Sequence, residues 1–326
     1  MNRAGQYAYL HGKLHGITAK SFLDSRFQTL LKLSNLSDVY RTLFPGEGLD
    51  ISEKDLVRLI ERKYELKNLA SYLRILEIFP DPPSLLVQSL RRFEIRNVKS
   101  ILRSIHTDLP LGELWDLGKY RRIPMPVETP RKSLESSPYA PFLEELQRKQ
   151  LGDVEFRLDE EYYRMLWKEI EALNKKERSI LKPAFLTELR LLNILWALRL
   201  RYYYKVDEEE VLQRLFLHDT VNVETEIKAL YQLPLDEGAP WQNWKYGWLV
   251  RVTSEGLIDP APANWRVFKR LYLLYRKIFY RRPFTLAAIY GFYRMKEYEV
   301  RLIHTLTEGM HIGVSESAIR ELVEGL

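Results

Sequence analysis

Residues 93–105 read Phe-Glu-Ile-Arg-Asn-Val-Lys-Ser-Ile-Leu-Arg-Ser-Ile, and this stretch decides the fold because its pattern returns twice further along the chain. Within it, Val98, Ile101, Leu102 and Ile105 are three or four residues apart, so they form one stripe of an α-helix. An apolar stripe of this kind has to be buried against other elements. The stretch therefore predicts a helix that packs inside a helical module.

The pattern recurs in residues 190–199 and 299–306. When the copies are aligned on Asn97, Asn193 and Leu302, apolar residues stand two positions before, one after and four after in each of them. Asn is shared by the first two copies, and the third has Leu. We call the helices predicted around these copies the key helices. Three copies predict an all-α protein of three similar helical modules, at residues 1–122, 123–218 and 219–326.

A short segment with an acidic start follows each key helix, at residues 111–117, 207–215 and 314–322. Carboxylates in a first turn oppose the positive end of a helix, so each segment is expected to form a short helix. Ser315 is the expected cap of the last one.

Further helices are expected at residues 5–32 and from Ser52 to Phe79, and Thr285 is expected to begin the third key helix. Gly12 and Gly16 lie in the first of these, and each costs about 1 kcal/mol relative to alanine in a helix. They therefore predict close packing or a break there. The apolar face of the second helix is expected to consist of Leu59, Leu66, Leu69, Leu73 and Leu76.

Prolines predict two further boundaries. Pro183 is tolerated best in the first turn of a helix, so the second key helix is expected to begin there. Residues 121–141 contain five prolines, which predicts a linker. No stretch alternates polar and apolar residues over a sustained length, so a nearly all-α structure is expected.

Composition restricts the class of protein. The chain has 326 residues, 46% of them apolar, no cysteine and a formal charge of +6. Its longest apolar runs, such as 194–198 and 286–292, fall well short of the roughly 20 residues of a membrane-spanning helix. The residues at the start lack the apolar core of a secretion signal, and a cytoplasmic location is expected.

No motif points to catalysis, a cofactor or a metal. Gly46-Glu47-Gly48 lacks the third glycine of a phosphate-binding loop and carries an acidic residue where the phosphate would lie. His11 and His15 share a helix face, but no third ligand is evident, so packing or surface histidines are expected. Asn97 and Arg103 lie on different sides of their helix, which favours packing or hydrogen bonding inside the module.

A basic seam and a Trp-rich stretch are open to more than one interpretation. Arg266, Arg270, Lys277 and Arg281 follow one side of a predicted helix, and no nucleic-acid motif accompanies them. A solvated or protein-facing surface is favoured over nucleic acid binding. Residues 241–248 contain three tryptophans, for which core packing is favoured and a partner surface comes second.

The chain as a whole resembles the C subunit of the rotary V-type/A-type ATPase, whose eukaryotic equivalent is named d. The resemblance rests on Tyr7-Ala8-Tyr9-Leu10, on residues 94–99 with Arg103, on Asn193 with Arg199, and on residues 296–301 with 313–319. It implies a funnel of three helical modules about a pseudo-threefold axis. The third copy departs from this pattern by lacking the Asn.

The resemblance implies a non-catalytic protein of the central stalk, held at the membrane by its complex. Such a protein caps the proteolipid rotor ring and couples it to the central shaft during ATP-linked proton or sodium transport. By analogy, the ring is contacted by the short segments and by arginines near them, which gives these candidates: Leu114, Leu117, Arg121, Arg122, Val211, Arg214, Leu215, Ala318, Arg320 and Leu322.

Two other functions remain open from the residues alone. A helical interaction scaffold unrelated to any ATPase is the main alternative. A nucleic-acid-binding repeat protein is the remote one.

Overall fold

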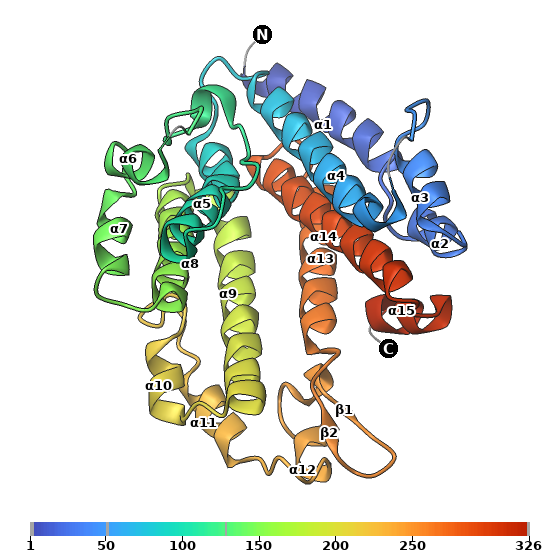
Figure 1. Cartoon of the computed structure of the whole chain (residues 1–326), viewed down its shortest axis with the longest axis vertical. Helices are drawn as coiled ribbons and strands as arrows, with labels where there is room; N and C mark the ends of the chain where they lie inside the picture. The colour runs from blue at the N-terminus through green and yellow to red at the C-terminus, as the bar shows by residue number, and fades with distance from the viewer. Residues whose placement is uncertain (1–2, 50–51, 128, 325–326) are drawn as a thin grey trace. The chain divides into compact units, whose positions relative to one another are not determined.

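A computed structural model describes residues 3–49, 52–127 and 129–324, and its regular secondary structure is almost entirely helical (Figure 1). Within these ranges the strands are β1 (Arg251–Val252) and β2 (Ile258–Asp259), which pair antiparallel as one small hairpin. The expected all-α class is confirmed.

Contacts divide the chain into two compact units. The first consists of residues 1–68 and 183–326, and the second of residues 69–182. Two long helices, α4 (Glu53–Leu76) and α9 (Lys175–Tyr204), contribute residues to both units. The three modules predicted from the repeats remain a prediction.

The core of the first unit forms around two long helices, α13 (Ala263–Arg281) and α14 (Leu286–His311). Thr285 starts α14 as predicted, because its hydroxyl accepts a hydrogen bond from the Ala288 amide at 3.1 Å. Gly291 lets the two backbones approach, since a Cβ there would lie 2.9 Å from the Tyr275 carbonyl oxygen. The other elements of this unit are α1 (Arg3–Ala19), α2 (Ser25–Leu31), α3 (Leu36–Leu43), α10 (Glu208–Gln213), α11 (Glu224–Gln232), α12 (Ala239–Gln242), η2 (Gly247–Leu249) and α15 (Glu316–Glu324).

The second unit is organised by α5 (Ser84–Thr107), the first key helix. Val98, Ile101 and Leu102 of the predicted stripe are buried, and Ile105 is half-buried. Helix α5 packs along α8 and also contacts α6. The remaining elements are η1 (Gly118–Tyr120), α6 (Pro130–Glu135), α7 (Ala140–Leu146) and α8 (Leu151–Glu171). Helix α6 lies within the predicted linker and buries Ser133 and Leu134, so this part of the linker belongs to the unit.

The short helix predicted at residues 111–117 is wrong, because that segment is irregular up to η1. Its backbone at Trp115 is bonded to the side chain of Asn97 and therefore takes no part in a helix. The other two short helices are confirmed as α10 and α15. Ser315 caps α15 by accepting a hydrogen bond from the Ala318 amide at 3.2 Å.

Two predictions about the first helices are corrected. Helix α1 ends at Ala19 and α2 begins at Ser25, so residues 5–32 are not one continuous helix. The close packing or break predicted at Gly12 and Gly16 is wrong. Both lie inside α1 with open space where a Cβ would stand.

Helix α9 begins at Lys175, eight residues before the predicted start, and contains Pro183. The Asn174 side chain accepts a hydrogen bond from the Glu177 amide at 3.1 Å, which supports the earlier start. Proline still removes one backbone donor within the helix.

The apolar face of α4 also differs from the prediction. Leu69 and Leu76 are buried, whereas Leu66 is 41% exposed and Leu59 and Leu73 are half-buried. Tyr64 and Tyr72 belong to the buried face instead. Leu56, Ile60 and Ile75 are buried there as well, so the face is not a row of leucines alone.

Candidate functional site

The first short segment is tied to its key helix through a single amide. Asn97 is 3% exposed; its Nδ2 donates to the Trp115 carbonyl and its Oδ1 accepts from the Trp115 amide, both at 2.8 Å. The side-chain amide thus satisfies both backbone groups of Trp115, as a neighbouring strand would. This pair fixes the position of residues 114–117 in the second unit.

The same arrangement recurs in the first unit. Asn193 is fully buried in α9; its Nδ2 donates to the Phe216 carbonyl at 2.9 Å and its Oδ1 accepts from the Phe216 amide at 2.8 Å. Asn97 and Asn193 are the residues on which the repeats align. Of the two roles that the sequence left open for Asn97, packing or hydrogen bonding, the structure shows hydrogen bonding, and Asn193 repeats it. Leu302, their counterpart in the third copy, is 3% exposed and packs as an apolar residue.

Arg103 has a separate role from Asn97, as expected from their places on the helix. Its guanidinium makes a two-pronged contact with the Glu155 carboxylate at 2.5 and 2.8 Å. This contact links α5 to α8 and raises the pKa of Arg103. Glu155 lies outside residues 1–122, so the bonding expected inside that module is wrong for Arg103. Arg199, the matching residue of α9, is exposed.

A buried carboxylate stands three residues before Asn97. Glu94 is 1% exposed and accepts hydrogen bonds from Arg91 Nη1 at 2.7 Å, from the Tyr139 hydroxyl at 2.9 Å and from the Arg122 amide. Burial and the adjacent carboxylate raise the pKa of Tyr139, so its hydroxyl stays a donor. Glu94 thereby connects α5 to the segment after η1 and to the start of α7.

A second buried carboxylate occupies the matching position before Leu302. Glu299 is fully buried; its Oε1 accepts from the Phe22 amide at 2.5 Å and from the Tyr64 hydroxyl at 2.6 Å, while Lys296 bonds the other oxygen. Both carboxylates therefore have the same three kinds of donor: a backbone amide, a tyrosine and a cation three residues earlier. The sequence shows that Glu94 and Glu299 stand at the same place in two copies. It does not show their hydrogen-bond partners, which come from distant segments.

A third buried carboxylate joins α9 to the core of the first unit. Glu188 is fully buried, accepts a hydrogen bond from the Tyr275 hydroxyl at 2.5 Å and is paired with Arg294. Despite the opposing effect of burial, Glu188 and Glu297 raise the pKa of Arg294. The hydrogen bonds of these three buried carboxylates join separate segments of the chain, so we call them structural anchors.

The contact candidates of the second unit differ in exposure. Leu117 is fully buried and Leu114 is half-buried. Arg121 is exposed, with a guanidinium nitrogen 3.6 Å from Asp116 Oδ1. The Arg122 side chain is exposed, while its amide bonds Glu94. Of these four residues, only the two arginines are exposed.

The candidates of the first unit divide in the same way. Val211 and Leu215 are buried at the end of α10, where Arg214 pairs with Glu210 at 2.8 Å. In α15, Ala318 is exposed and Leu322 is half-buried. Arg320 bonds Gln28 and also Glu316 at 2.5 Å. The buried side chains support their segments, and contact with a ring through the exposed ones remains a prediction.

Sequence reasoning missed a feature at the ends of the three key helices. Each is followed by a residue with a left-handed backbone: Asp108 at φ 55°, Lys205 at φ 56° and Gly313 at φ 75°. Large apolar side chains next to these residues are exposed: Leu109 by 64%, Tyr203 by 54%, Tyr204 by 65%, Ile312 by 74% and Val314 by 37%. We call them the tip residues. Gly313 was the one available signal, because glycine commonly follows a helix end.

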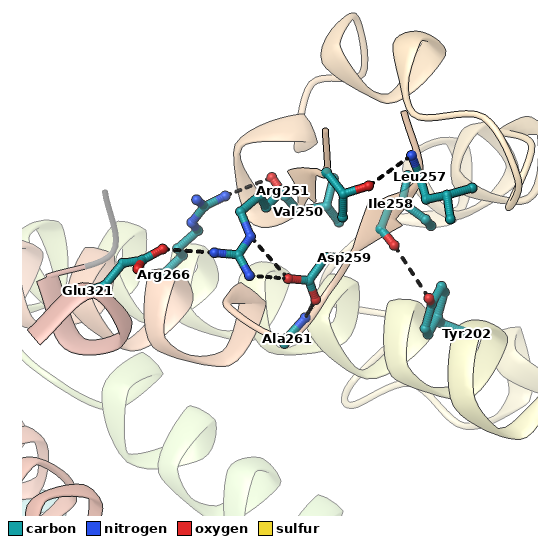
Figure 2. Close-up of polar contacts among 10 residues, drawn as sticks. Tyr202, Val250, Arg251, Leu257, Ile258, Asp259, Ala261, Arg266 and Glu321 are labelled. Atoms are coloured by element: carbon teal, nitrogen blue, oxygen red, sulfur yellow. Dashed lines mark hydrogen bonds and ion pairs between the residues drawn. The ribbon is translucent and has the colours of Figure 1, made fainter. Parts of the chain in front are cut away.

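The Trp-rich stretch lies beside the hairpin. Arg251 pairs with Asp259 at 2.7 Å and with Glu321 at 2.8 Å, and Arg266 donates to the Val250 carbonyl at 2.7 Å, as Figure 2 shows. On the other side, the Tyr202 hydroxyl donates to the Ile258 carbonyl at 3.4 Å (Figure 2). Trp241 is fully buried, which agrees with core packing, whereas Trp248 is 39% exposed.

The two histidines of α1 pack as aromatic residues. The rings of His11 and His15 have centroids 4.4 Å apart, and His15 stacks on Phe279 at 4.7 Å. Burial and the neighbouring His15 lower the pKa of His11. Among the residues that the structure describes, no group of three His, Asp or Glu side chains is placed to hold a metal ion.

Residues 10–322 match the family described as ATP synthase (C/AC39) subunit. The chain belongs to this family. The match spans all three key helices and the segments that follow them, so the resemblance drawn from the repeats is confirmed. Membership makes the protein a subunit of a V/A-type ATPase.

A relative of this C/AC39 subunit is an uncharacterized protein of Treponema pallidum (strain Nichols). The two are 27% identical over 331 residues, which cover 97% of this chain and 95% of the relative. The similarity thus extends over nearly the full length of both. In the described part of the chain, no helix combines the length and the apolar character needed to span a bilayer.

Proposed function

We propose that this C/AC39 subunit is the non-catalytic part of a central stalk that caps the proteolipid rotor ring and couples it to the central shaft. Through this coupling, ATP turnover elsewhere in the complex would drive, or be driven by, proton or sodium transport. The observation that carries the proposal is the family match over residues 10–322. The protein would be attached peripherally, on the cytoplasmic side.

Internal stiffness supports a role in transmitting torque. An adaptor under shear needs helices whose contacts do not slide, and buried ion pairs with several hydrogen bonds resist sliding because breaking one leaves a charge unpaired. Glu94, Glu188 and Glu299 each join two or more segments in this way. We propose that the three sequence modules, at residues 1–122, 123–218 and 219–326, take a pseudo-threefold arrangement suited to a ring.

The ring would be met by the short segments and the tip residues. Asn97 and Asn193 hold their segments against the key helices, so that a load on a segment passes to the helix. Exposed Arg121 and Arg122, with half-buried Arg214 and Arg320, would meet acidic loops or lipid headgroups, and exposed Ala318 would contact the ring as an apolar residue. Leu117, Val211 and Leu215 would brace the segments from inside, because they are buried.

Isolation of the intact complex tests this function. The full chain, carrying an affinity tag, is purified from gently solubilised membranes, and its partners are identified by mass spectrometry. We expect a proteolipid and shaft subunits of an ATPase. Recovery of the chain alone, or with unrelated proteins, would favour a separate helical scaffold and overturn the proposal.

A variant tests the ring contact itself. Arg121→Glu with Arg122→Glu should weaken binding to purified ring by about tenfold or more, because two attractive charges become repulsive. The matched control reverses Arg131 and Lys132, which are also exposed in the same unit. Equal binding of variant and wild type would remove these arginines from the contact.

A further inference from the structure

Helix α13 stands in a stretch without acidic residues. No Asp or Glu occurs from Pro260 to Lys296, while the helix itself carries six Lys and Arg residues. One side of the helix is buried against the core through Trp265, Tyr272 and Phe279. The opposite side has no role in the fold described above.

That opposite side is a continuous exposed stripe. Arg270, Leu273, Lys277, Tyr280 and Arg281 recur every three or four residues and are all exposed, with Leu273 and Tyr280 each at 47%. Spacing of this kind places them on an arc about 100° wide. We call these five residues the α13 stripe. It alternates cations with large apolar side chains over roughly 16 Å.

Three cations of the stripe have no carboxylate partner in the part of the chain that the structure describes. Among the residues that the structure describes, Arg276 of α13 lies 3.5 Å from Asp24, but Arg270, Lys277 and Arg281 have no carboxylate partner. Arg270 instead lies over the Trp248 ring, 5.8 Å from its centroid. The charge is therefore available to a second molecule.

An aromatic residue marks each end of the stripe. Trp248, 39% exposed, lies beside Arg270 at one end. Phe284 follows the helix at the other end, with φ 57° and 57% exposure. A left-handed backbone costs a non-glycine residue roughly 1 kcal/mol or more. Phe284 has this conformation, and its phenyl ring is largely exposed to solvent. The rings of Phe284 and His11 pack edge to face, with their centroids 4.9 Å apart.

We propose that the α13 stripe docks an amphipathic helix of another protein chain, with Asp or Glu beside an apolar row. A helix matches the stripe because side chains spaced by three and four on both partners interdigitate. The positive charge of the stripe is complementary to acidic residues on the partner helix. Leu273 and Tyr280 would pack against apolar residues of that helix. Nucleic acid fits less well, since a phosphate backbone would leave these apolar side chains without a partner. A membrane surface would engage a broader face.

Photo-cross-linking in native membranes tests this surface. The full chain carries p-benzoylphenylalanine in place of Leu273 or Tyr280, and the linked peptides are identified by mass spectrometry. We expect both positions to link to one protein segment that is helical and has acidic residues three or four apart. The control position is Leu66, which is 41% exposed in α4 of the same unit and should not link to that segment.

A charge reversal provides the second arm. Arg270→Glu, Lys277→Glu and Arg281→Glu together should reduce the cross-linked product by about tenfold or more. The matched control is the triple variant Lys20→Glu, Lys32→Glu and Arg199→Glu, which changes the net charge equally at other exposed positions. It should leave the amount of cross-linked product unchanged. Cross-links to lipid, to nucleic acid or to a segment without acidic residues, or no cross-link at all, would overturn the proposal.

The two proposals fail separately. If the linked helix belongs to a protein outside any ATPase, the docking surface stands and the proposed function falls. If the chain purifies with a proteolipid ring but the stripe links to nothing, the function stands and the docking surface falls.

Discussion

Asn97 and Trp115 exchange two hydrogen bonds, each 2.8 Å long, across 18 residues of sequence. One buried side chain thereby decides the course of the segment after the first key helix. Asn193 and Phe216 repeat this relationship in the other unit. The pairs explain why Asn stands at this position in two copies, and they define the first test.

Asn97→Ala should destabilise its unit by about 2–3 kcal/mol, because the Trp115 amide and carbonyl lose their partners while buried. Hydrogen exchange at the Trp115 amide should also become faster in the variant, because this amide loses its hydrogen bond to Asn97. Faster exchange there would show that the lost stability comes from this contact. Asn193→Ala should act in the same way on Phe216. The reverse change, Leu302→Asn, should also destabilise, since the new amide is buried at a position that is 3% exposed. Unchanged exchange at Trp115 would show that the segment is held by other contacts.

Glu299→Gln should lower the stability of the first unit by roughly 3 kcal/mol, because it leaves the Lys296 charge buried without its carboxylate. Thermal unfolding followed by circular dichroism measures the loss. Glu237→Gln, at an exposed position elsewhere in the first unit, is the control and should shift the midpoint little. Adding Lys296→Met to Glu299→Gln should restore part of the stability. No recovery in the double variant would argue against an ion pair as the source of the loss.

Stability should fall as pH rises through the titration of Glu61. Burial, with the nearby Glu308 and Glu65 carboxylates, raises the pKa of Glu61 from 4.5 to about 6, while its bond with Thr307 opposes this. The folded state therefore binds the proton more tightly than the unfolded state. The stabilisation is complete below pH 4.5 and is lost as pH rises through about 6.

Partial exposure limits this loss to the order of 1 kcal/mol. Glu61→Gln keeps an oxygen acceptor for the Thr307 hydroxyl, which lies 3.0 Å away, and never ionises. Urea unfolding from pH 4 to 8 should therefore show a smaller decline for the variant. Parallel curves for variant and wild type would contradict the assignment to Glu61.

Replacing glycine by alanine should have opposite effects at Gly291 and Gly12. Gly291→Ala should destabilise the first unit by about 1–3 kcal/mol, because the new Cβ would meet the Tyr275 carbonyl oxygen at 2.9 Å. Gly12→Ala should stabilise α1 by about 1 kcal/mol, since nothing lies within 4 Å of the new Cβ. Denaturant midpoints of the two variants provide the comparison. A stable Gly291→Ala protein would mean that α13 and α14 adjust to each other easily.

The repeats and the apolar periodicity determined where most helices form. The three key helices, α10, α15 and the start of α14 at Thr285 follow from residues close together in sequence, because helical spacing and capping are local interactions. The same reasoning found Asn97 and Asn193 as buried, hydrogen-bonded positions. The family resemblance rested on these residues.

Only the tertiary structure decided which distant groups meet. The Trp115 backbone could form a helix with its neighbours or bond to Asn97, and the buried amide prevails, so residues 111–117 are irregular. Glu94 and Glu299 find their tyrosine donors 45 and 235 residues away. The sequence already placed Arg270, Lys277 and Arg281 on one side of a helix, but only the folded structure shows that Leu273 and Tyr280 are exposed beside them. Local periodicity specifies a helix and its apolar face, whereas the partner of each buried charge depends on which segments the folded chain brings together.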